Sequence, residues 1–172
     1  ILAWMPQFLY WKEITGHYIF FSYGEEGGAF YWAHPNIREN LFSYRKGWFV
    51  YTPIMLFAVA GIGLLRKRIP GLFLPLIVFT LAMVYVQSSW WSWWFGGGFG
   101  LRAYVDMYGL MAIPLAAVLE YAFKHSKKAI RIGIPTAIIV LMFFQLQQHW
   151  QYRKNIIHYV GMHKELYWKS FL

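Results

Sequence analysis

Four long apolar stretches limit the folds open to this chain. They cover residues 48–65, 69–87, 104–123 and 129–146, and charged side chains occur only near their ends. A helix of about 20 residues crosses the ~30 Å hydrocarbon core of a bilayer. Because a segment in hydrocarbon must satisfy its own backbone hydrogen bonds, each stretch is predicted to be a membrane-spanning helix. Each also contains an internal proline, predicted to kink the helix without ending it: Pro53, Pro75, Pro114 and Pro135.

Composition excludes an ordinary water-soluble domain. The chain is 59% hydrophobic and only 13% charged, whereas soluble domains carry about 25% charged residues. The formal net charge of +9 would suggest nucleic acid in a soluble protein. Here the basic residues flank apolar runs, where they set topology and meet lipid phosphates, so no nucleic-acid partner is predicted.

The distribution of basic residues predicts the orientation. Only Arg102 lies between the second and third stretches. Seven basic residues lie in or directly beside the other two connections: Arg66, Lys67, Arg68, Lys124, Lys127, Lys128 and Arg131. Basic loops stay in the cytoplasm. Loops 12–47 and 88–103 and the C-terminal tail are therefore expected to face outward, which in a bacterium is the periplasm.

These patterns predict an all-α, polytopic membrane bundle with four full spans plus part of a fifth. Residues 1–11 are interpreted as the end of a preceding membrane helix, and 12–47 as an external loop with interfacial helices. Residues 48–146 form the four-span domain, and 147–172 an external tail with an interfacial helix and an aromatic anchor. The start of the sequence inside a helix suggests a piece of a longer protein.

The segment SSWWSWWFGGGFGLRAYVD, residues 88–106, carries the richest chemistry. Its tryptophans alone would suit an interfacial belt. A belt does not need Gly96, Gly97, Gly98 and Gly100, which permit positive φ and close backbone approach to a ligand. Their exposed amides could form an anion-binding nest. We expect Trp93 and Trp94 to contact a sugar or lipid beside Gly96, Gly97 and Gly100.

Arg102 is the leading candidate for a phosphate ligand, because a guanidinium presents a planar fork of donors to phosphate oxygens. The alternative is an ion pair with Asp106, four residues on; both hold if Asp106 orients the arginine. Arg45 and Lys46 at the outer face are auxiliary candidates, with plain headgroup binding as the alternative. Glu120 is expected to pair with Lys124 at i+4.

Metal and thiol chemistry have little support in the sequence. There is no cysteine, and the six histidines lack metal-ligand spacing, so no metal ligand is assigned and a divalent metal is left open. Glu25 and Glu26 are candidates for a general base or a metal ligand, against the alternative of a solvated pair.

Two motifs resemble one family. LFSYRKGWFVYTPIMLFAVAGI is similar to the loop-to-helix segment of bacterial GT-C type membrane glycosyltransferases, the relatives of dolichyl-phosphate-mannose protein mannosyltransferases and aminoarabinose transferases. WWSWWFGGGFGLRAYVD resembles their tryptophan- and glycine-rich loop ending in arginine. The matching positions are Ser43, Arg45, Gly47, Tyr51 and Pro53 in the first motif and Trp94, Gly96, Gly97, Gly100 and Arg102 in the second.

The resemblance implies an inverting enzyme of the bacterial inner membrane that moves a sugar from a polyprenyl-phosphate donor to an acceptor at the outer face. Its catalytic acid is expected upstream of this chain, so no catalytic residue is assigned here. The partners would be the lipid-linked sugar, membrane lipid and further membrane subunits. Two alternatives remain: a non-catalytic membrane subunit of a larger complex, and a polyprenyl-phosphate carrier or flippase.

Overall fold

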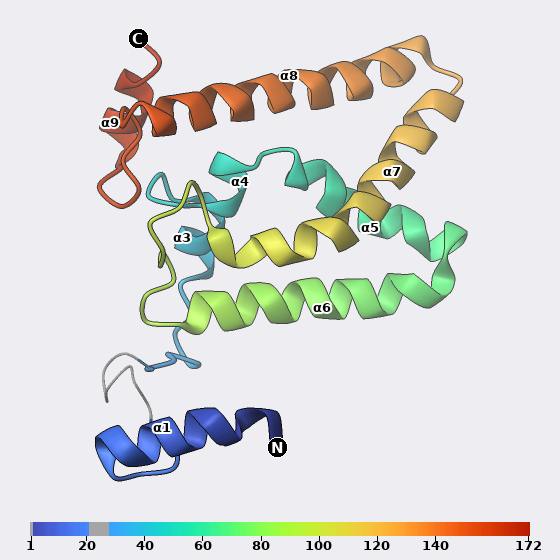
Figure 1. The fold of residues 1–172 in the computed structure, drawn as a ribbon. Helices are drawn as coiled ribbons and strands as arrows, with labels where there is room; N and C mark the ends of the chain where they lie inside the picture. Colours follow the sequence, from blue (N-terminus) through green and yellow to red (C-terminus); the bar gives the residue numbers. More distant parts are fainter. Residues whose placement is uncertain (1, 21–27) are drawn as a thin grey trace. The chain divides into compact units, whose positions relative to one another are not determined.

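The computed structural model describes residues 2–20 and 28–172. The chain divides into two compact units, Ile1–Phe30 and Tyr31–Leu172. Every regular element of the described residues is a helix (Figure 1). Glu25 and Glu26, the acidic pair singled out in the sequence, lie outside the described residues.

The first unit contains the short 3-10 helix η1 (Leu2–Trp4) and α1 (Met5–Thr15). Gly16 ends α1 in the left-handed conformation, and its N–H donates to the Lys12 carbonyl at 3.0 Å. The helix predicted for residues 1–11 therefore continues to Thr15, because the first residue able to terminate it in this way is the glycine.

The second unit contains the remaining helices and all the predicted spans. They are α3 (Ile37–Phe42), α4 (Trp48–Tyr51), α5 (Met55–Arg68), α6 (Pro70–Ser89), the 3-10 helix η2 (Arg102–Met107), α7 (Tyr108–Lys124), α8 (Lys128–Arg153) and α9 (Lys164–Lys169). Three helical segments are long and apolar enough to cross a membrane: Pro70–Ser89, Arg102–Lys124 and Lys128–Arg153. These helices continue through their internal prolines, as predicted: Pro75, Pro114 and Pro135.

The stretch 48–65, predicted as a continuous span, is instead two helices, α4 and α5. Proline disfavours the helical conformation of the residue before it, and Thr52, before Pro53, has φ −138° and ψ 63°. At about 1.5 Å per residue, the 14 residues of α5 cover only ~21 Å. The fourth full span is therefore not present as one continuous helix.

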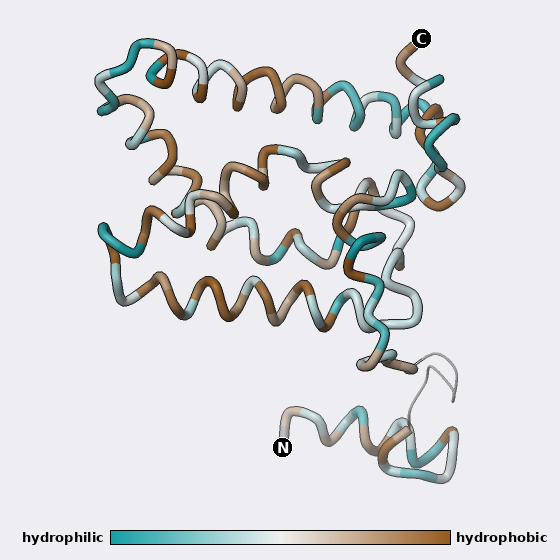
Figure 2. The backbone as a smooth tube through the Cα atoms, turned by 180° about the vertical axis from the view of Figure 1, so that it is seen from behind, coloured by the Kyte–Doolittle hydropathy of each residue, from teal (hydrophilic) through white to brown (hydrophobic). Residues whose placement is uncertain are grey.

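The helix predicted over residues 129–146 is longer at its C-terminal end, because α8 continues to Arg153. Figure 2 shows that the apolar character fades along its last turns, where glutamines follow Leu146. Side chains beyond that point hold the helix in place: Gln148 donates to the Val50 carbonyl at 3.0 Å and Gln151 to the Ser170 carbonyl at 2.6 Å. The only tail helix in the described structure is α9, and residues 156–160, expected in an interfacial helix, are irregular.

The core of the second unit lies between α5 and α7, with the aromatic residues of α4 and η2 at one end. Its buried residues include Trp48, Met55, Ala58, Ile62, Tyr104, Met107 and Met111. A close helix approach depends on Gly61, because an added Cβ would collide with the Pro114 carbonyl oxygen and lie 2.7 Å from Cγ2 of Val118. Small residues commonly allow such backbone contact between membrane helices.

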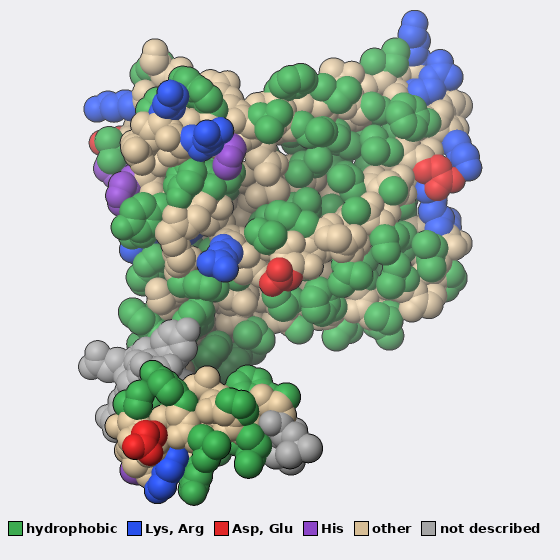
Figure 3. Space-filling model, viewed as in Figure 1, with side chains coloured by type: hydrophobic (Ala, Val, Ile, Leu, Met, Phe, Trp, Pro, Cys, Tyr) green, Lys and Arg blue, Asp and Glu red, His purple; other side chains and the backbone are tan. Residues whose placement is uncertain are grey.

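The turn between α5 and α6 and the turn between α7 and α8 both carry basic residues, and we call them the basic turns. They lie at the same end of the second unit (Figure 1), where charged side chains gather in Figure 3. Arg68 at the end of α5 donates to the Ala117 carbonyl at 3.1 Å and pairs with Glu120. The predicted pair of Glu120 with Lys124 is confirmed at 2.6 Å. The opposite end holds the loop between α6 and η2, the entry to α4, and the tail.

Candidate functional site

Two tryptophans attach the loop between α6 and η2, residues 90–101, to the hydrophobic core. Trp93 is buried in the main core, and Trp94 is half-buried with its ring at 88° to that of Trp93 and 5.5 Å from it. Of the two tryptophans expected to contact a sugar or lipid, Trp93 is therefore used for packing. Trp94 keeps part of its surface accessible.

Two glycines give this loop its path. Gly96 has φ +85° and Gly100 has φ +61°, a region that residues with a side chain rarely adopt. At Gly100 an added Cβ would also lie 3.0 Å from Cβ of Tyr51. Gly97 has ordinary φ, and its carbonyl accepts a hydrogen bond from the Tyr152 hydroxyl. The loop is thus anchored to the C-terminal end of α8.

Lys46 holds the loop from the other side. Its ammonium donates to the Gly96 carbonyl and to the Phe95 carbonyl, the latter at 3.5 Å, and only 1% of the residue is exposed. Burial, together with the neighbouring charge of Arg45, lowers the pKa of Lys46 to about 8. In this arrangement Lys46 binds backbone carbonyls, so its predicted contact with a phosphate stays a prediction.

Arg45 stacks on the aromatic part of the same loop. Its guanidinium carbon lies 3.8 Å from the centre of the Trp94 ring, the geometry of a cation–π contact. The Arg45 backbone N–H donates to Ser43 Oγ at 3.1 Å. Its Nε is buried without a hydrogen-bond partner among the described residues. The guanidinium is therefore oriented by stacking on Trp94, and its N–H groups have no hydrogen-bond acceptor among the described residues.

Arg102 is exposed at the beginning of η2. Its Cδ, the methylene next to the guanidinium, lies 3.8 Å from the position of a Cβ added to Gly96, so the outer part of the side chain lies beside the loop. Within residues 28–172, Arg102 makes no ion pair with Asp106, which is also exposed. The reason is that residues 102–107 form a 3-10 helix, in which i and i+3 share a face and i+4 is turned away by ~120°.

The three predicted cations consequently meet one short segment, residues 94–96. Arg45 stacks on the ring of Trp94, Lys46 binds the carbonyls of Phe95 and Gly96, and the Arg102 side chain passes beside Gly96. Residues 45–46 and 102 are far apart in the sequence, and the loop brings them together. Among residues 2–20 and 28–172, the Arg45 and Arg102 guanidinium groups have no hydrogen-bond acceptor, whereas the Lys46 ammonium has two.

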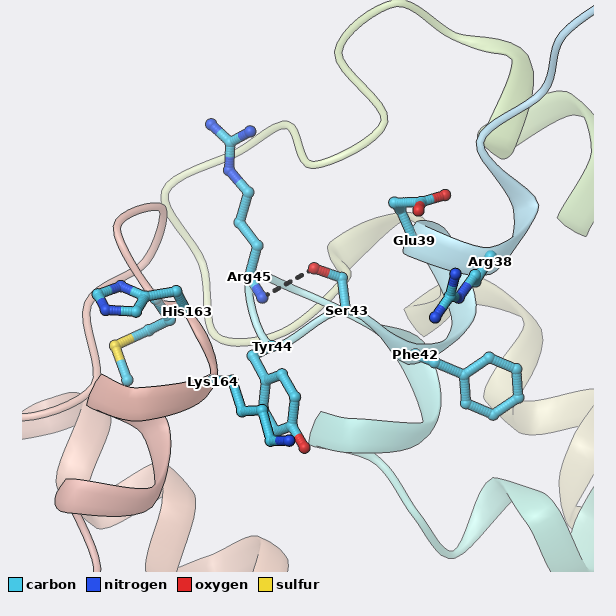
Figure 4. A pocket seen from close by; sticks show the side chains of 9 residues that line it. Arg38, Glu39, Phe42, Ser43, Tyr44, Arg45, His163 and Lys164 are labelled. Carbon is cyan, nitrogen blue, oxygen red and sulfur yellow. Dashed lines mark hydrogen bonds between the residues drawn. The ribbon is translucent and has the colours of Figure 1, made fainter.

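A cavity of about 600 Å³ lies beside Arg45. Figure 4 shows side chains around this space from α3, from the segment that follows it, and from the segment that leads into α9: Arg38, Glu39, Phe42, Ser43, Tyr44, Arg45, Met162, His163 and Lys164. In this view the Arg45 side chain extends away from Ser43. Arg38 and His163 lie on opposite sides of the cavity. The cavity thus carries several cationic groups and one acid.

Sequence reasoning missed the contribution of the tail to this end of the molecule. Tyr152 donates a hydrogen bond to the loop of residues 90–101, which we call the glycine loop. Three further tail residues line the cavity: Met162, His163 and Lys164. The nearest signal in the sequence is the mixture of aromatic and basic residues after Trp150, which predicts an interfacial helix and an aromatic anchor. No spacing in the sequence indicates that this segment folds back on residues 43–47.

In residues 2–20 and 28–172, no three histidine, aspartate or glutamate side chains come together in a way that could hold a metal ion. The described residues therefore offer no metal ligand set. Comparisons of the chain with family models, with curated proteins and with solved structures gave no match.

Proposed function

We propose that this chain is part of a membrane glycosyltransferase and that its second unit binds the phosphate of a polyprenyl-phosphate-linked sugar. The observation that supports this is the convergence of Arg45, Lys46 and Arg102 on residues 94–96 of the glycine loop. The resemblance of residues 41–62 and 90–106 to bacterial GT-C type enzymes supplies the reaction class.

The chemistry requires cations at this place. When a sugar leaves a polyprenyl phosphate, negative charge develops on the departing phosphate, and donors positioned in advance lower the barrier. Arg102 and Arg45 would contact this phosphate through their unused guanidinium donors. Lys46 would act indirectly, because its ammonium holds the Phe95 and Gly96 carbonyls and so fixes the loop that both arginines contact.

The remaining groups would complete the donor site. Trp94, whose ring supports Arg45, would contact the sugar or the lipid at its accessible edge. Gly96, Gly97 and Gly100 would allow the backbone to approach the ligand. The prenyl chain would lie among apolar helices. Asp106 would orient Arg102 only after a change in the conformation of η2, since no ion pair or hydrogen bond joins the two among the described residues.

The proposed enzyme is integral to the bacterial inner membrane with this site on the periplasmic side. The placement of both basic turns at the opposite end of the second unit supports this orientation. In this arrangement α4 and α5 together would make the fourth crossing, as a helix interrupted at Pro53, and α1 would belong to the fifth.

The test is the affinity of the chain for undecaprenyl phosphate, measured by native mass spectrometry from detergent or nanodiscs. Arg102→Ala should weaken binding at least tenfold, whereas Arg131→Ala, which removes an arginine from the basic turn between α7 and α8, should not. Equal affinity in wild type and Arg102→Ala would contradict the assignment. A sugar-transfer assay on the longest available chain then separates a transferase from a carrier, which would move the lipid without releasing its sugar.

A further inference from the structure

The two basic turns carry positive charge that their own helices do not neutralise. Seven lysine and arginine side chains lie in or beside them, whereas Glu120 is the only acidic residue in helices α5 to α8. Its carboxylate is engaged by both Arg68 and Lys124. No acidic side chain of these helices is left for the other five basic residues, which are Arg66, Lys67, Lys127, Lys128 and Arg131.

These five cations are accessible to a ligand. All of them are exposed, and within residues 2–20 and 28–172 their side chains make no hydrogen bond or ion pair. The hydrogen bond to His125 Nδ1, at 3.1 Å, comes from the backbone N–H of Lys127 and leaves its ammonium free. Two of the five lie at the end of α5, and three lie at the beginning of α8. The fold thus presents two groups of unused donors, one on each basic turn.

Glu120 connects the two turns. Arg68, the last residue of α5, pairs with this carboxylate and donates to the Ala117 carbonyl at 3.1 Å. Lys124, the last residue of α7, reaches the same carboxylate at 2.6 Å. The end of α5 is therefore tied to the end of α7, which leads directly into α8. A ligand meets two cationic groups whose supports are already joined.

Apolar side chains lie beside both groups of cations. Ile69 between α5 and α6, Phe123 in the last turn of α7 and Ile132 in α8 are exposed. Each of the segments Pro70–Ser89, Arg102–Lys124 and Lys128–Arg153 is long and apolar enough to cross a membrane and begins or ends at a basic turn. Cations at such helix ends lie at headgroup depth. A lipid would cover the apolar side chains while its headgroup meets the cations, which a soluble anion would not do.

The division of the cations between two turns favours a headgroup with two phosphates. A phosphodiester carries a single negative charge, so a lipid with one phosphate would match one turn and leave the other without an anion. Two phosphodiesters on one lipid would match both turns. Basic sites between the ends of membrane helices are suited to headgroups of this kind.

We propose that the basic turns together bind one phospholipid that carries two phosphodiesters. One phosphate would meet the cations at the end of α5, and the other those at the beginning of α8. The glycine loop lies at the opposite end of the second unit (Figure 1), so this lipid is a component of the bilayer and not a substrate of the proposed donor site. The proposal does not depend on the glycosyltransferase assignment.

The experiment titrates the detergent-solubilised chain with tetraoleoyl cardiolipin and with dioleoyl phosphatidylglycerol, and native mass spectrometry measures both affinities. The proteins are wild type, Arg66→Gln/Lys67→Gln, Lys127→Gln/Lys128→Gln and the charge-matched control Arg153→Gln/Lys154→Gln. All the replaced side chains are exposed, and the control pair lies at the other end of α8.

Wild type should bind cardiolipin about tenfold more tightly than phosphatidylglycerol, because only cardiolipin reaches both turns. Each turn variant should lose about tenfold in cardiolipin affinity and so fall to the level of phosphatidylglycerol. The control should match wild type for both lipids. Undecaprenyl phosphate, titrated in parallel, should bind the turn variants as it binds wild type.

Four results would overturn the site. Equal affinity of wild type for the two lipids, or a loss in only one turn variant, would show that no single lipid bridges the turns. An equal loss in the control would show that net charge explains the effect. Competition by inorganic pyrophosphate at the concentrations at which cardiolipin binds would show that the ligand is a soluble anion. If cardiolipin binds as expected and undecaprenyl phosphate does not bind at all, this site is upheld and the donor proposal fails.

Discussion

The guanidinium of Arg45 lies 3.8 Å from the centre of the Trp94 ring. This contact joins the segment before α4 to the loop of residues 90–101. It also fixes the position of the Arg45 guanidinium, whose Nε has no hydrogen-bond partner in the described structure. A stacked guanidinium is worth about 0.5–2 kcal/mol depending on desolvation. Its main effect here is to set the direction of the arginine without using its hydrogen-bond donors.

The stacking makes the contributions of these two residues interdependent. Trp94→Leu should weaken undecaprenyl phosphate binding about threefold to tenfold, since Arg45 then loses its support and becomes more mobile. Arg45→Gln should weaken it further, and adding Trp94→Leu to Arg45→Gln should cost little more. A titration by native mass spectrometry measures all four proteins. Strictly additive losses would show that Trp94 acts independently of Arg45.

Gly61 and Gly63 form a matched pair on α5. A methyl group at Gly61 collides with the backbone of Pro114, whereas at Gly63 it meets nothing within 4 Å. Gly61→Ala should therefore lower the free energy of unfolding by about 1–3 kcal/mol. Gly63→Ala should be neutral or stabilising by up to ~1 kcal/mol, because alanine favours the helix. Thermal unfolding of the detergent-solubilised chain measures both, and similar behaviour of the two variants would contradict the α5–α7 packing.

Gly100 should tolerate no side chain, in contrast to Gly98. Gly100→Ala places a Cβ on a residue with φ +61° and 3.0 Å from Tyr51, while at Gly98 φ is not positive and no atom lies within 4 Å. The left-handed conformation alone costs about 1–2 kcal/mol with a side chain. Gly100→Ala should lower the unfolding temperature and weaken lipid phosphate binding, and Gly98→Ala should leave both near wild type. Loss of binding in Gly98→Ala alone would instead indicate direct ligand contact at that position.

Lys46 should make stability depend on pH above neutrality. Because burial lowers its pKa from 10.5 to about 8, the unfolded chain binds more protons than the folded one between about pH 8 and 10.5. Stability attributable to Lys46 therefore rises with pH across this window and is flat below it. Comparison with Lys46→Met isolates the effect: the stability of wild type relative to the variant should increase from pH 8 to pH 10. A constant difference over this range would show that the ammonium is not buried as described.

The apolar runs were sufficient to predict the three long helices, because a bilayer-length segment with few charges has only one way to satisfy its backbone. They were insufficient at Pro53. There the apolar run continues although the helix is interrupted. Whether a proline kinks a helix or divides it depends on which neighbours hydrogen-bond to the backbone groups that lose their helical partners. Thr52, at the break, shares a 3.1 Å hydrogen bond with the Tyr108 hydroxyl of α7, a partner that no local pattern identifies.

The candidate site divides in the same way. The amino-acid sequence already shows which groups are available: the glycines that allow a left-handed loop, the cations beside the second apolar loop and the tryptophans next to them. Their roles follow from the fold, because burial and hydrogen-bond partners depend on contacts between residues distant in sequence. It buried Trp93 and Lys46, left Arg45 and Arg102 with free donors, and separated Arg102 from Asp106 by a 3-10 turn. Residue type fixes what a side chain can do, and the packing around it fixes which of those interactions it makes.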